Sequence, residues 1–251
     1  MQPPAVQTKF LHLSNSFSLR NGATLDKVCV AYEQYGSLTP EKDNAILLFH
    51  ALSGSQHAYG YNPEVPGTGS LWKPENHEGW WNSIIGPGKP LDTDRFCIIC
   101  ANYLGGCYGT TGPATPCPAD GQPYGSRFPH VEVADQARFQ ALLLDSLGIE
   151  RVHLMGPSVG GLIALSFACQ FPERVRSFIS IGSGYRASIE HRLSLFEQIL
   201  AIELDPDFQG GDYYRGPAPK KGLAFARIIG HKSFVYQEGL EQRARKEVGG
   251  Q

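Results

Sequence analysis

The sequence Gly156-Pro157-Ser158-Val159-Gly160 joins a strand-like run to a helix-like run, and no other feature constrains the fold as strongly. Residues 151–155 are typical of a buried strand, and residues 162–168 are typical of an apolar helix. In a nucleophile elbow, a serine between such elements is held exposed on a strained backbone, and flanking glycines leave room for the turn. We therefore predict that Ser158 is a nucleophile. The alternative is a glycine-rich turn that holds a serine by chance or cradles a phosphate.

Length and charge limit the classes of partner. The chain has 251 residues, 41% hydrophobic, enough to bury one large core or one core plus an insertion. A formal net charge of -2, without a Lys/Arg run, predicts neither a nucleic-acid nor a membrane surface. No apolar run approaches the roughly 20 residues of a membrane span, and residues 1–16 lack the pattern of a signal peptide. We expect small-molecule substrates and a cytoplasmic location.

The six cysteines fit a reducing compartment better than a disulfide framework. Cys97 and Cys100 form a C-x-x-C inside a strand-like run, where residues three apart point to opposite faces of a sheet. No second cysteine or histidine pair completes a zinc set. We expect core packing for both thiols and no metal site, with metal or redox chemistry as the alternative.

Strand and helix signals alternate up to about residue 183. The strand-like runs are 10–19, 28–35, 45–50, 96–101, 151–155 and 177–182, and the helix-like runs are 133–147, 162–168 and 190–202. The first two runs suggest an antiparallel hairpin joined at Asn21-Gly22. The remainder predicts an α/β fold with a mostly parallel sheet flanked by helices. We expect a core over 1–183 and a helical lid insertion over 184–251. The long loop 53–88 is either an ordered surface excursion or a loop that shapes the substrate site.

Several separate strings resemble one family. They are His50-Ala51-Leu52-Ser53-Gly54, Gly79-Trp80-Trp81 with Ile85-Gly86-Pro87-Gly88, Leu91-Asp92-Thr93-Asp94-Arg95, residues 102–113 (NYLGGCYGTTGP) and residues 222–231 (GLAFARIIGH). Together they make the chain, from about residue 10 to about residue 245, resemble the homoserine O-acetyltransferases. That resemblance implies an α/β-hydrolase fold with a partial helical lid.

The resemblance also implies an activity and a set of site residues. Members of this family move an acetyl group from acetyl-CoA to the side-chain hydroxyl of L-homoserine, through an acyl-serine, in methionine biosynthesis. Ser158 matches the nucleophile, the backbone N–H groups of Leu52 and Val159 match the oxyanion donors, and Arg227 matches the arginine that holds the amino-acid substrate. Acetyl-CoA is then a co-substrate, no bound cofactor is needed, and the full-length form is expected to be a homodimer.

Three departures from the family pattern are visible. Val159 stands where the family usually has methionine, which a backbone donor tolerates, and Phe234 stands where a tyrosine is common. The family's catalytic acid and base lie well beyond the lid, and we predict that the catalytic Asp and His are not present in this chain. His191 and His231 follow the elbow but suit surface or packing positions, and the aspartates near residue 206 suit turns. Such a truncated chain would leave an exposed sheet edge.

Three classes of function therefore stay open. The first is a homoserine O-acetyltransferase, with a succinyl donor or a serine acceptor as variants. The second is an esterase that transfers the acyl group to water. The third is an inactive fragment that only binds a partner or a ligand, because without a base the serine hydroxyl is a weak nucleophile.

Overall fold

The structure is a computed structural model that describes residues 3–232, 236, 238–239 and 241–242. Phe234 lies outside the described residues. The chain divides into two units, residues 1–185 and 186–251, and each is described by itself. Among the residues described, no helix has both the length and the apolar character that crossing a membrane requires.

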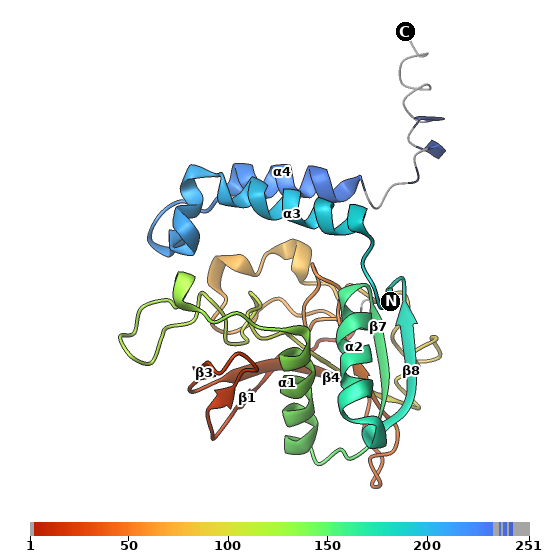
Figure 1. Cartoon of the computed structure of the whole chain (residues 1–251). Coiled ribbons are helices and arrows are strands. Elements are labelled where there is room, and N and C mark those ends of the chain that lie inside the picture. The colour runs from red at the N-terminus through yellow and green to blue at the C-terminus, as the bar shows by residue number, and fades with distance from the viewer. Residues whose placement is uncertain (1–2, 233–235, 237, 240, 243–251) are drawn as a thin grey trace. The chain divides into compact units, whose positions relative to one another are not determined.

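The first unit is built on a six-stranded sheet (Figure 1). Its strands, in spatial order, are β1 (Lys9–His12), β4 (Cys29–Tyr35), β6 (Cys97–Ala101), β5 (Ala45–Leu48), β7 (Val152–Pro157) and β8 (Val175–Ile181). β6, β5, β7 and β8 are parallel neighbours, whereas β4 is antiparallel to β1 and to β6. The mostly parallel α/β sheet predicted from the sequence is confirmed.

Alternation along the central strands divides the core into two clusters, one on each face of the sheet. Ala45 and Leu47 of β5 belong to one cluster, and Ile46 and Leu48 belong to the other. Cys97 and Cys100 of β6 are separated in the same way, and both are fully buried. Burial raises the pKa of the Cys97 thiol to about 11 and that of Cys100 well above its ordinary value. The two thiols therefore pack on opposite faces, as the sequence predicts.

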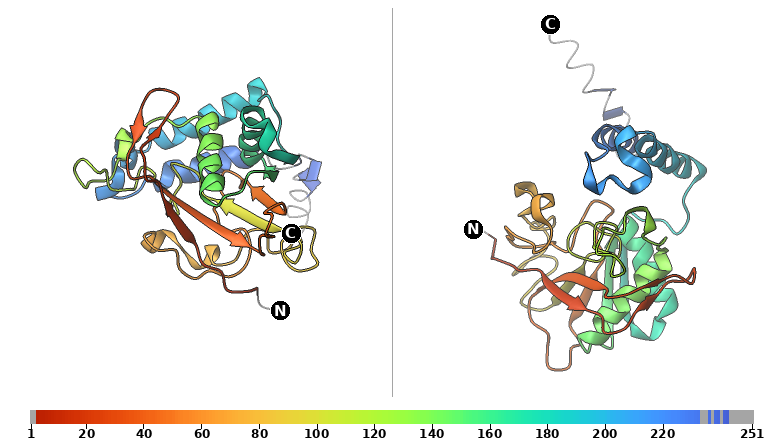
Figure 2. Two further views of the ribbon diagram at one scale, coloured as in Figure 1. Left: turned by 90° about the horizontal axis from the view of Figure 1, so that it is seen from below. Right: turned by 90° about the vertical axis from the view of Figure 1, so that its left-hand side faces the viewer.

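Two helices pack together over one of these faces, α1 (Val133–Ser146) and α2 (Val159–Gln170) (Figure 2). The backbone N–H of Glu132 donates to Asp135 Oδ2 at 3.1 Å where α1 begins, and α1 ends before Gly148 at φ 65°. The other face is covered by the long loop that follows β5, through Ala58, Tyr59, Ile85 and Leu91. This loop is an ordered part of the core.

The N-terminal hairpin differs from its prediction. β1 does pair with β4, with Phe10 opposite Ala31. However, the turn at Gly22, with φ 87°, joins a separate two-stranded sheet of β2 (Phe17–Ser18) and β3 (Thr24–Leu25). The predicted strand 10–19 is therefore interrupted after His12, because Phe17 turns its ring into the core against Phe139 of α1.

β8 is the outermost strand of the described sheet (Figure 1). One of its edges pairs with β7, and the other has no partner strand among the described residues. Phe178, Ile179 and Ile181 are 36%, 48% and 43% exposed, although their side chains are apolar. The exposed edge expected from the sequence is thus β8.

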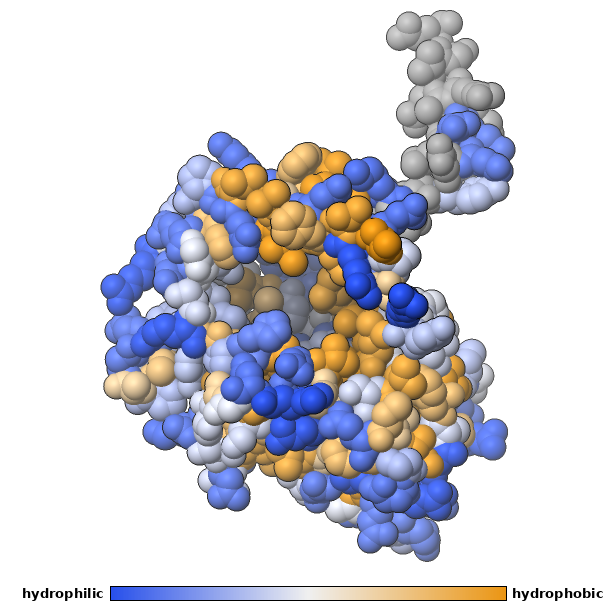
Figure 3. Space-filling model, in the orientation of Figure 1, coloured by the Kyte–Doolittle hydropathy of each residue, from blue (hydrophilic) through white to orange (hydrophobic). Residues whose placement is uncertain are grey.

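The second unit is helical. α3 (Ile189–Glu203) and α4 (Lys220–His231) form an antiparallel pair (Figure 1). Asp205, just after α3, accepts hydrogen bonds from the backbone N–H of Asp207 at 3.0 Å and of Gly222 at 2.7 Å. It therefore connects the end of α3 to the first turn of α4. Apolar side chains remain on the surface of this unit (Figure 3).

The short 3-10 helices of the described chain are Gly69–Leu71, Pro74–Asn76, Gly125–Arg127, Pro172–Arg174, Pro206–Gly211 and Tyr213–Arg215.

Candidate active site

Ser158 stands between the end of β7 and the first residue of α2, with an exposed side chain. Its φ of 54° and ψ of -126° place a non-glycine residue in a backbone region that costs on the order of 1–3 kcal/mol. Two backbone hydrogen bonds hold it there: its N–H donates to Ile181 O at 2.9 Å, and its C=O accepts from Gly161 N at 2.9 Å. This is the geometry of a nucleophile elbow.

The glycines beside Ser158 are required by close approach. A side chain at Gly160 would place its Cβ 2.3 Å from Phe49 O and 2.7 Å from His50 O. A Cβ at Gly156 would lie 2.4 Å from the carbonyl carbon of Gly160. The turn therefore presses the start of α2 against the backbone that leaves β5.

That contact brings the predicted oxyanion loop beside the elbow. β5 and β7 are adjacent parallel strands, and Phe49 N donates to Met155 O at 2.9 Å just beyond their register. Leu52 follows three residues later, and its side chain is 77% exposed. Within the described chain, the backbone N–H groups of Leu52 and Val159 and the hydroxyl of Ser158 have no hydrogen-bond partner. Two unused donors near an exposed serine are what an oxyanion requires.

His50 and Tyr103 hold the start of this loop in place. Their rings stack at a centroid distance of 3.8 Å, and the Tyr103 hydroxyl donates to His50 O at 2.6 Å. His50 Nδ1 lies 2.7 Å from Ala51 O, an acceptor, so this nitrogen carries the proton. Burial lowers the pKa of His50 to about 4, opposed in part by its hydrogen bonds. His50 is therefore neutral at pH 7 and, with a pKa of about 4, only a weak base, and its hydrogen bonds hold the start of the loop.

The structure also contains a carboxylate and histidine pair that sequence reasoning missed. Glu33 Oε2 lies 2.8 Å from His57 Nδ1, and both side chains are almost fully buried. Glu33 is on β4, three strands from β7, which is about 14 Å across a sheet. Both ring nitrogens of His57 already have partners, Glu33 Oε2 and His77 O, so neither member of the pair is a partner for the Ser158 hydroxyl. The only sequence signal was a charged residue in the middle of an otherwise buried strand.

Arg227 and the two late histidines lie in the helical unit. Arg227 is at an exposed position of α4, His231 is the last residue of that helix, and His191 is in the first turn of α3, also exposed. The structure places Ser158, Leu52 and Val159 in the first unit, where the elbow packs against Phe49 and His50 at the start of the loop that contains Leu52. It describes Arg227 only within the second, so its substrate contact stays a prediction.

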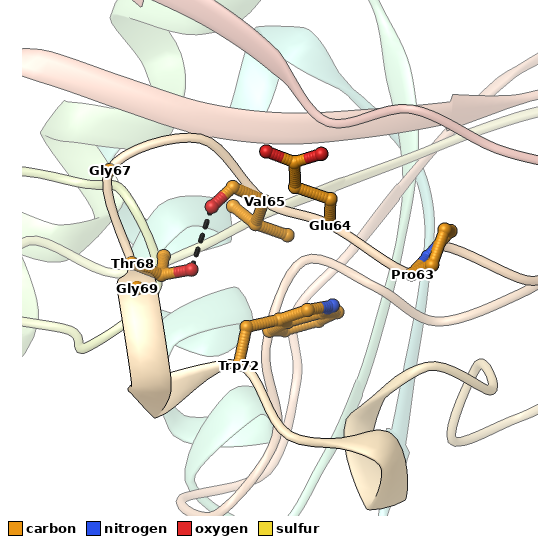
Figure 4. A pocket seen from close by; sticks show the side chains of 7 residues that line it. All are labelled: Pro63, Glu64, Val65, Gly67, Thr68, Gly69 and Trp72. Carbon is orange, nitrogen blue, oxygen red and sulfur yellow. Dashed lines mark hydrogen bonds between the residues drawn. The ribbon is translucent and has the colours of Figure 1, made fainter.

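A surface pocket of about 490 Å³ lies along the long loop, and none of the predicted site residues lines it. Its lining includes the Trp72 ring and the Glu64 carboxylate, and the Thr68 hydroxyl is already bonded to Val65 O at 2.7 Å (Figure 4). None of its lining residues is a serine, cysteine or histidine. The pocket therefore carries no candidate nucleophile or imidazole base.

The sequence matches the family model described as alpha/beta hydrolase fold over residues 44–237. The chain belongs to the alpha/beta hydrolase fold family. Within that family it is 43% identical over 242 residues to a homoserine O-acetyltransferase from Deferribacter desulfuricans, covering 95% of this chain and 61% of the relative. It is 41% identical to a homoserine O-succinyltransferase from Aromatoleum aromaticum, covering 95% of this chain and 62% of the relative.

A solved esterase structure is similar to this chain in fold. The crystal structure of an esterase superposes with a TM-score of 0.83 at 32% identity, covering 96% of this chain and 65% of that one. The chain thus spans about three fifths of the length of the curated relatives it matches.

Proposed function

We propose that the chain carries the acylation half of a homoserine O-acetyltransferase, with Ser158 as the nucleophile. The observation that carries the proposal is the exposed Ser158 at φ 54°, in an elbow that packs against the start of the loop containing Leu52. The backbone N–H groups of Leu52 and Val159 have no acceptor in the described chain. The names of relatives with 43% and 41% identity support an acyltransferase that uses homoserine. The proposed enzyme is cytoplasmic, belongs to methionine biosynthesis, and is a homodimer in its full-length form.

In the first half-reaction the Ser158 oxygen attacks the carbonyl carbon of acetyl-CoA. Negative charge develops on the former carbonyl oxygen, where the N–H groups of Leu52 and Val159 donate to it. The C–S bond then breaks, the thiol of coenzyme A leaves with a proton, and Ser158 holds the acetyl ester. In the second half-reaction the homoserine hydroxyl attacks that ester and releases Ser158. The Arg227 guanidinium suits a two-pronged contact with the carboxylate of the amino acid.

The proton that Ser158 loses needs an acceptor, and we infer that this acceptor comes from outside these 251 residues. His50 has a pKa of about 4, and His57 uses both of its ring nitrogens in buried hydrogen bonds. His153 bonds to Ser177 at 2.8 Å and lies five residues before the elbow, roughly 16 Å along a strand. The base that is predicted to be absent from this chain would accept the proton of the Ser158 hydroxyl, and the acid would orient that base.

The experiment is product analysis with acetyl-CoA, succinyl-CoA and either homoserine or serine, on the wild-type chain and on Ser158→Ala and Arg227→Ala. With imidazole added as an external base for the missing acceptor, we expect acetyl transfer to homoserine, and we expect Ser158→Ala to abolish it. Arg227→Ala should mainly raise the homoserine concentration that is needed for half-maximal transfer. Preference for succinyl-CoA or for serine would correct the substrates. Equal product from wild type and Ser158→Ala would refute the proposed nucleophile.

The second candidate is an esterase, favoured by the likeness to a solved esterase and by the exposed Ser158. A water molecule would then take the acetyl group from Ser158 in place of homoserine. Release of acetate at the same rate with and without homoserine would support an esterase. No adduct and no product from a folded chain, even with imidazole added as an external base, would support the third class, an inactive fragment.

A further inference from the structure

The loop between Phe49 and Ala58 is fastened at both ends and more loosely bonded in the middle. At its first end, Phe49 N donates to Met155 O and Tyr103 donates to His50 O. In the middle, Gly54 N donates to Ala51 O at 2.9 Å and closes a tight turn around Leu52. The position of the Leu52 N–H therefore depends on what holds the second end.

The second end is held by a buried polar cluster centred on Glu33. The Tyr35 hydroxyl lies 2.8 Å from Gln56 O and accepts a hydrogen bond from Ala58 N at 2.6 Å. The same hydroxyl lies 2.8 Å from Glu33 Oε2. Tyr35 thus connects the backbone on both sides of His57 to the carboxylate of Glu33.

His57 adds a contact in the same stretch of loop. Its Nδ1 lies 2.8 Å from Glu33 Oε2, and its Nε2 lies 3.0 Å from His77 O. A carbonyl oxygen can only accept, so Nε2 carries a proton, and Nδ1 shares a second proton with the carboxylate. The ring is therefore clamped between β4 and the backbone at residue 77. Removal of either partner would leave an uncompensated buried polar group.

The Glu33 carboxylate has donors for both oxygens. Oε1 accepts from the Thr8 hydroxyl at 2.7 Å and from Asn62 Nδ2 at 3.0 Å, in addition to the two contacts at Oε2. Burial alone would raise the pKa of Glu33, but the hydrogen bond and the charge of His57, with the hydrogen bonds of Thr8 and Asn62, lower it. A fully bonded buried carboxylate is a rigid attachment point.

We propose that Glu33, Tyr35 and His57 are positioning residues for acyl transfer, which anchor the loop of residues 49–58 so that the Leu52 N–H stays beside Ser158. The catalytic part of this inference rests on the proposed function. The anchoring part rests on the contacts alone, because residues 55–58 have their backbone bonded to Tyr35 and to the Trp80 indole. A displacement of the loop would cost oxyanion stabilisation without touching the serine.

The test compares Glu33→Gln and Tyr35→Phe with Leu143→Ala, a buried residue of α1 that serves as the control for general loss of stability. Two readouts are taken on each chain. Amide hydrogen exchange is followed in peptides covering residues 50–58 and in peptides covering α1. With imidazole added as an external base to every chain, the rate constant for acetylation of Ser158 and the acetyl-CoA concentration at half-maximal rate are followed by intact mass.

We expect both Glu33→Gln and Tyr35→Phe to raise exchange in residues 50–58 by about tenfold or more, with α1 unchanged, whereas Leu143→Ala raises exchange in α1. The acetylation rate constant should fall about tenfold in these two variants while the half-saturating concentration stays within about twofold. Tyr35→Phe keeps the ring in the core, so it stays informative where Glu33→Gln fails to fold.

Unchanged exchange in residues 50–58 for Tyr35→Phe would overturn the anchor. Faster exchange of the loop with an unchanged acetylation rate would overturn its catalytic consequence. Absence of any acetyl adduct on the wild-type chain, even with an added base, would refute the proposed function of Ser158, and the exchange result would still decide the anchor.

Discussion

Backbone geometry at a single residue, Ser158, decides what chemistry the chain can carry. Its φ of 54° is held by hydrogen bonds with Ile181 and Gly161. Gly156 lets the turn close on Gly160, and Gly160 lets the elbow approach the carbonyls of Phe49 and His50. A strained residue held by its surroundings is a feature of functional sites. The close approach of Gly160 to Phe49 O and His50 O also packs the elbow against the start of the loop that contains Leu52.

Replacement of Gly160 by alanine tests that contact. A Cβ 2.3 Å from Phe49 O forces the backbone apart, so we expect Gly160→Ala to lower the free energy of unfolding by about 3 kcal/mol or more. Urea denaturation measures the effect. Gly121→Ala is the control, since Gly121 has φ 72° but no neighbour within 4 Å, and it should cost about 1 kcal/mol. Equal losses in the two variants would contradict the close approach.

His50 predicts a pH dependence of stability. Its pKa is about 4 in the folded chain because of burial, against 6.5 when unfolded. The unfolded chain takes up this proton first, so the contribution of His50 is complete above pH 6.5 and is lost as pH falls toward 4. The loss is on the order of 3 kcal/mol. Denaturation curves between about pH 4.5 and 7.5 measure it.

His50→Phe keeps a ring against Tyr103 but cannot titrate, so its stability should fall less steeply below pH 6.5 than that of the wild type. His191→Phe, at an exposed position of α3, is the control for loss of a histidine. An unchanged slope in His50→Phe would show that His50 is not the group responsible.

Local residue patterns predicted the elbow but not the buried cluster of Glu33, Tyr35 and His57. Ser158 and its glycines are adjacent in sequence, so the strand, turn and helix around them can be read locally. Glu33 and His57 are 24 positions apart and meet only because the loop after β5 folds back over β4 and β6. Nothing in their local sequence specifies that return, and a lone glutamate in a strand is compatible with an edge position or a solvent-facing side chain.

At the scale of elements, predictions held where hydrophobic periodicity was strong. α1, α2, β5, β6 and β7 lie close to their expected ranges because each has a continuous apolar run or face. The N-terminal strands were less well predicted, since residues 13–28 form a second small hairpin that packs Phe17 on α1. Tertiary contact, and not local preference, interrupts that run.

The exposed edge of β8 predicts self-association. Phe178, Ile179 and Ile181 present apolar side chains beside unpaired backbone groups, a combination that favours intermolecular strand pairing. We expect concentration-dependent association that Ile179→Lys reduces, measured by light scattering. Leu71→Lys, which removes another exposed apolar residue away from the edge, is the control. Equal association in Ile179→Lys and the wild type would exclude this edge.

The hairpin of α3 and α4 depends on Asp205. Hydrogen bonds from the Gly222 and Asp207 N–H groups lower the pKa of Asp205, so its contribution is present above the ordinary pKa of a carboxyl group and is lost in acid. We expect Asp205→Asn to increase hydrogen exchange within α4 while α1 is unaffected. Asp207→Asn, next to it in the same turn, is the matched control. Unaltered exchange in α4 would show that Asp205 does not hold the hairpin.

The whole molecule belongs to the alpha/beta hydrolase fold family and spans about three fifths of its curated relatives. Its first unit contains the proposed nucleophile and two candidate oxyanion donors, and its second unit contains the arginine predicted to hold the substrate. We therefore propose a chain in which Ser158 is built for acylation while its proton acceptor lies outside these residues.

A direct test of that division is the intact mass of the chain after incubation with acetyl-CoA, beside Ser158→Ala, with circular dichroism to show that both are folded. We expect little or no acetyl adduct on the wild-type chain alone, and an adduct confined to Ser158 when imidazole is added as an external base. Rapid acetylation of the wild-type chain without added base would contradict the missing acceptor. An adduct of equal size on Ser158→Ala would contradict the nucleophile itself.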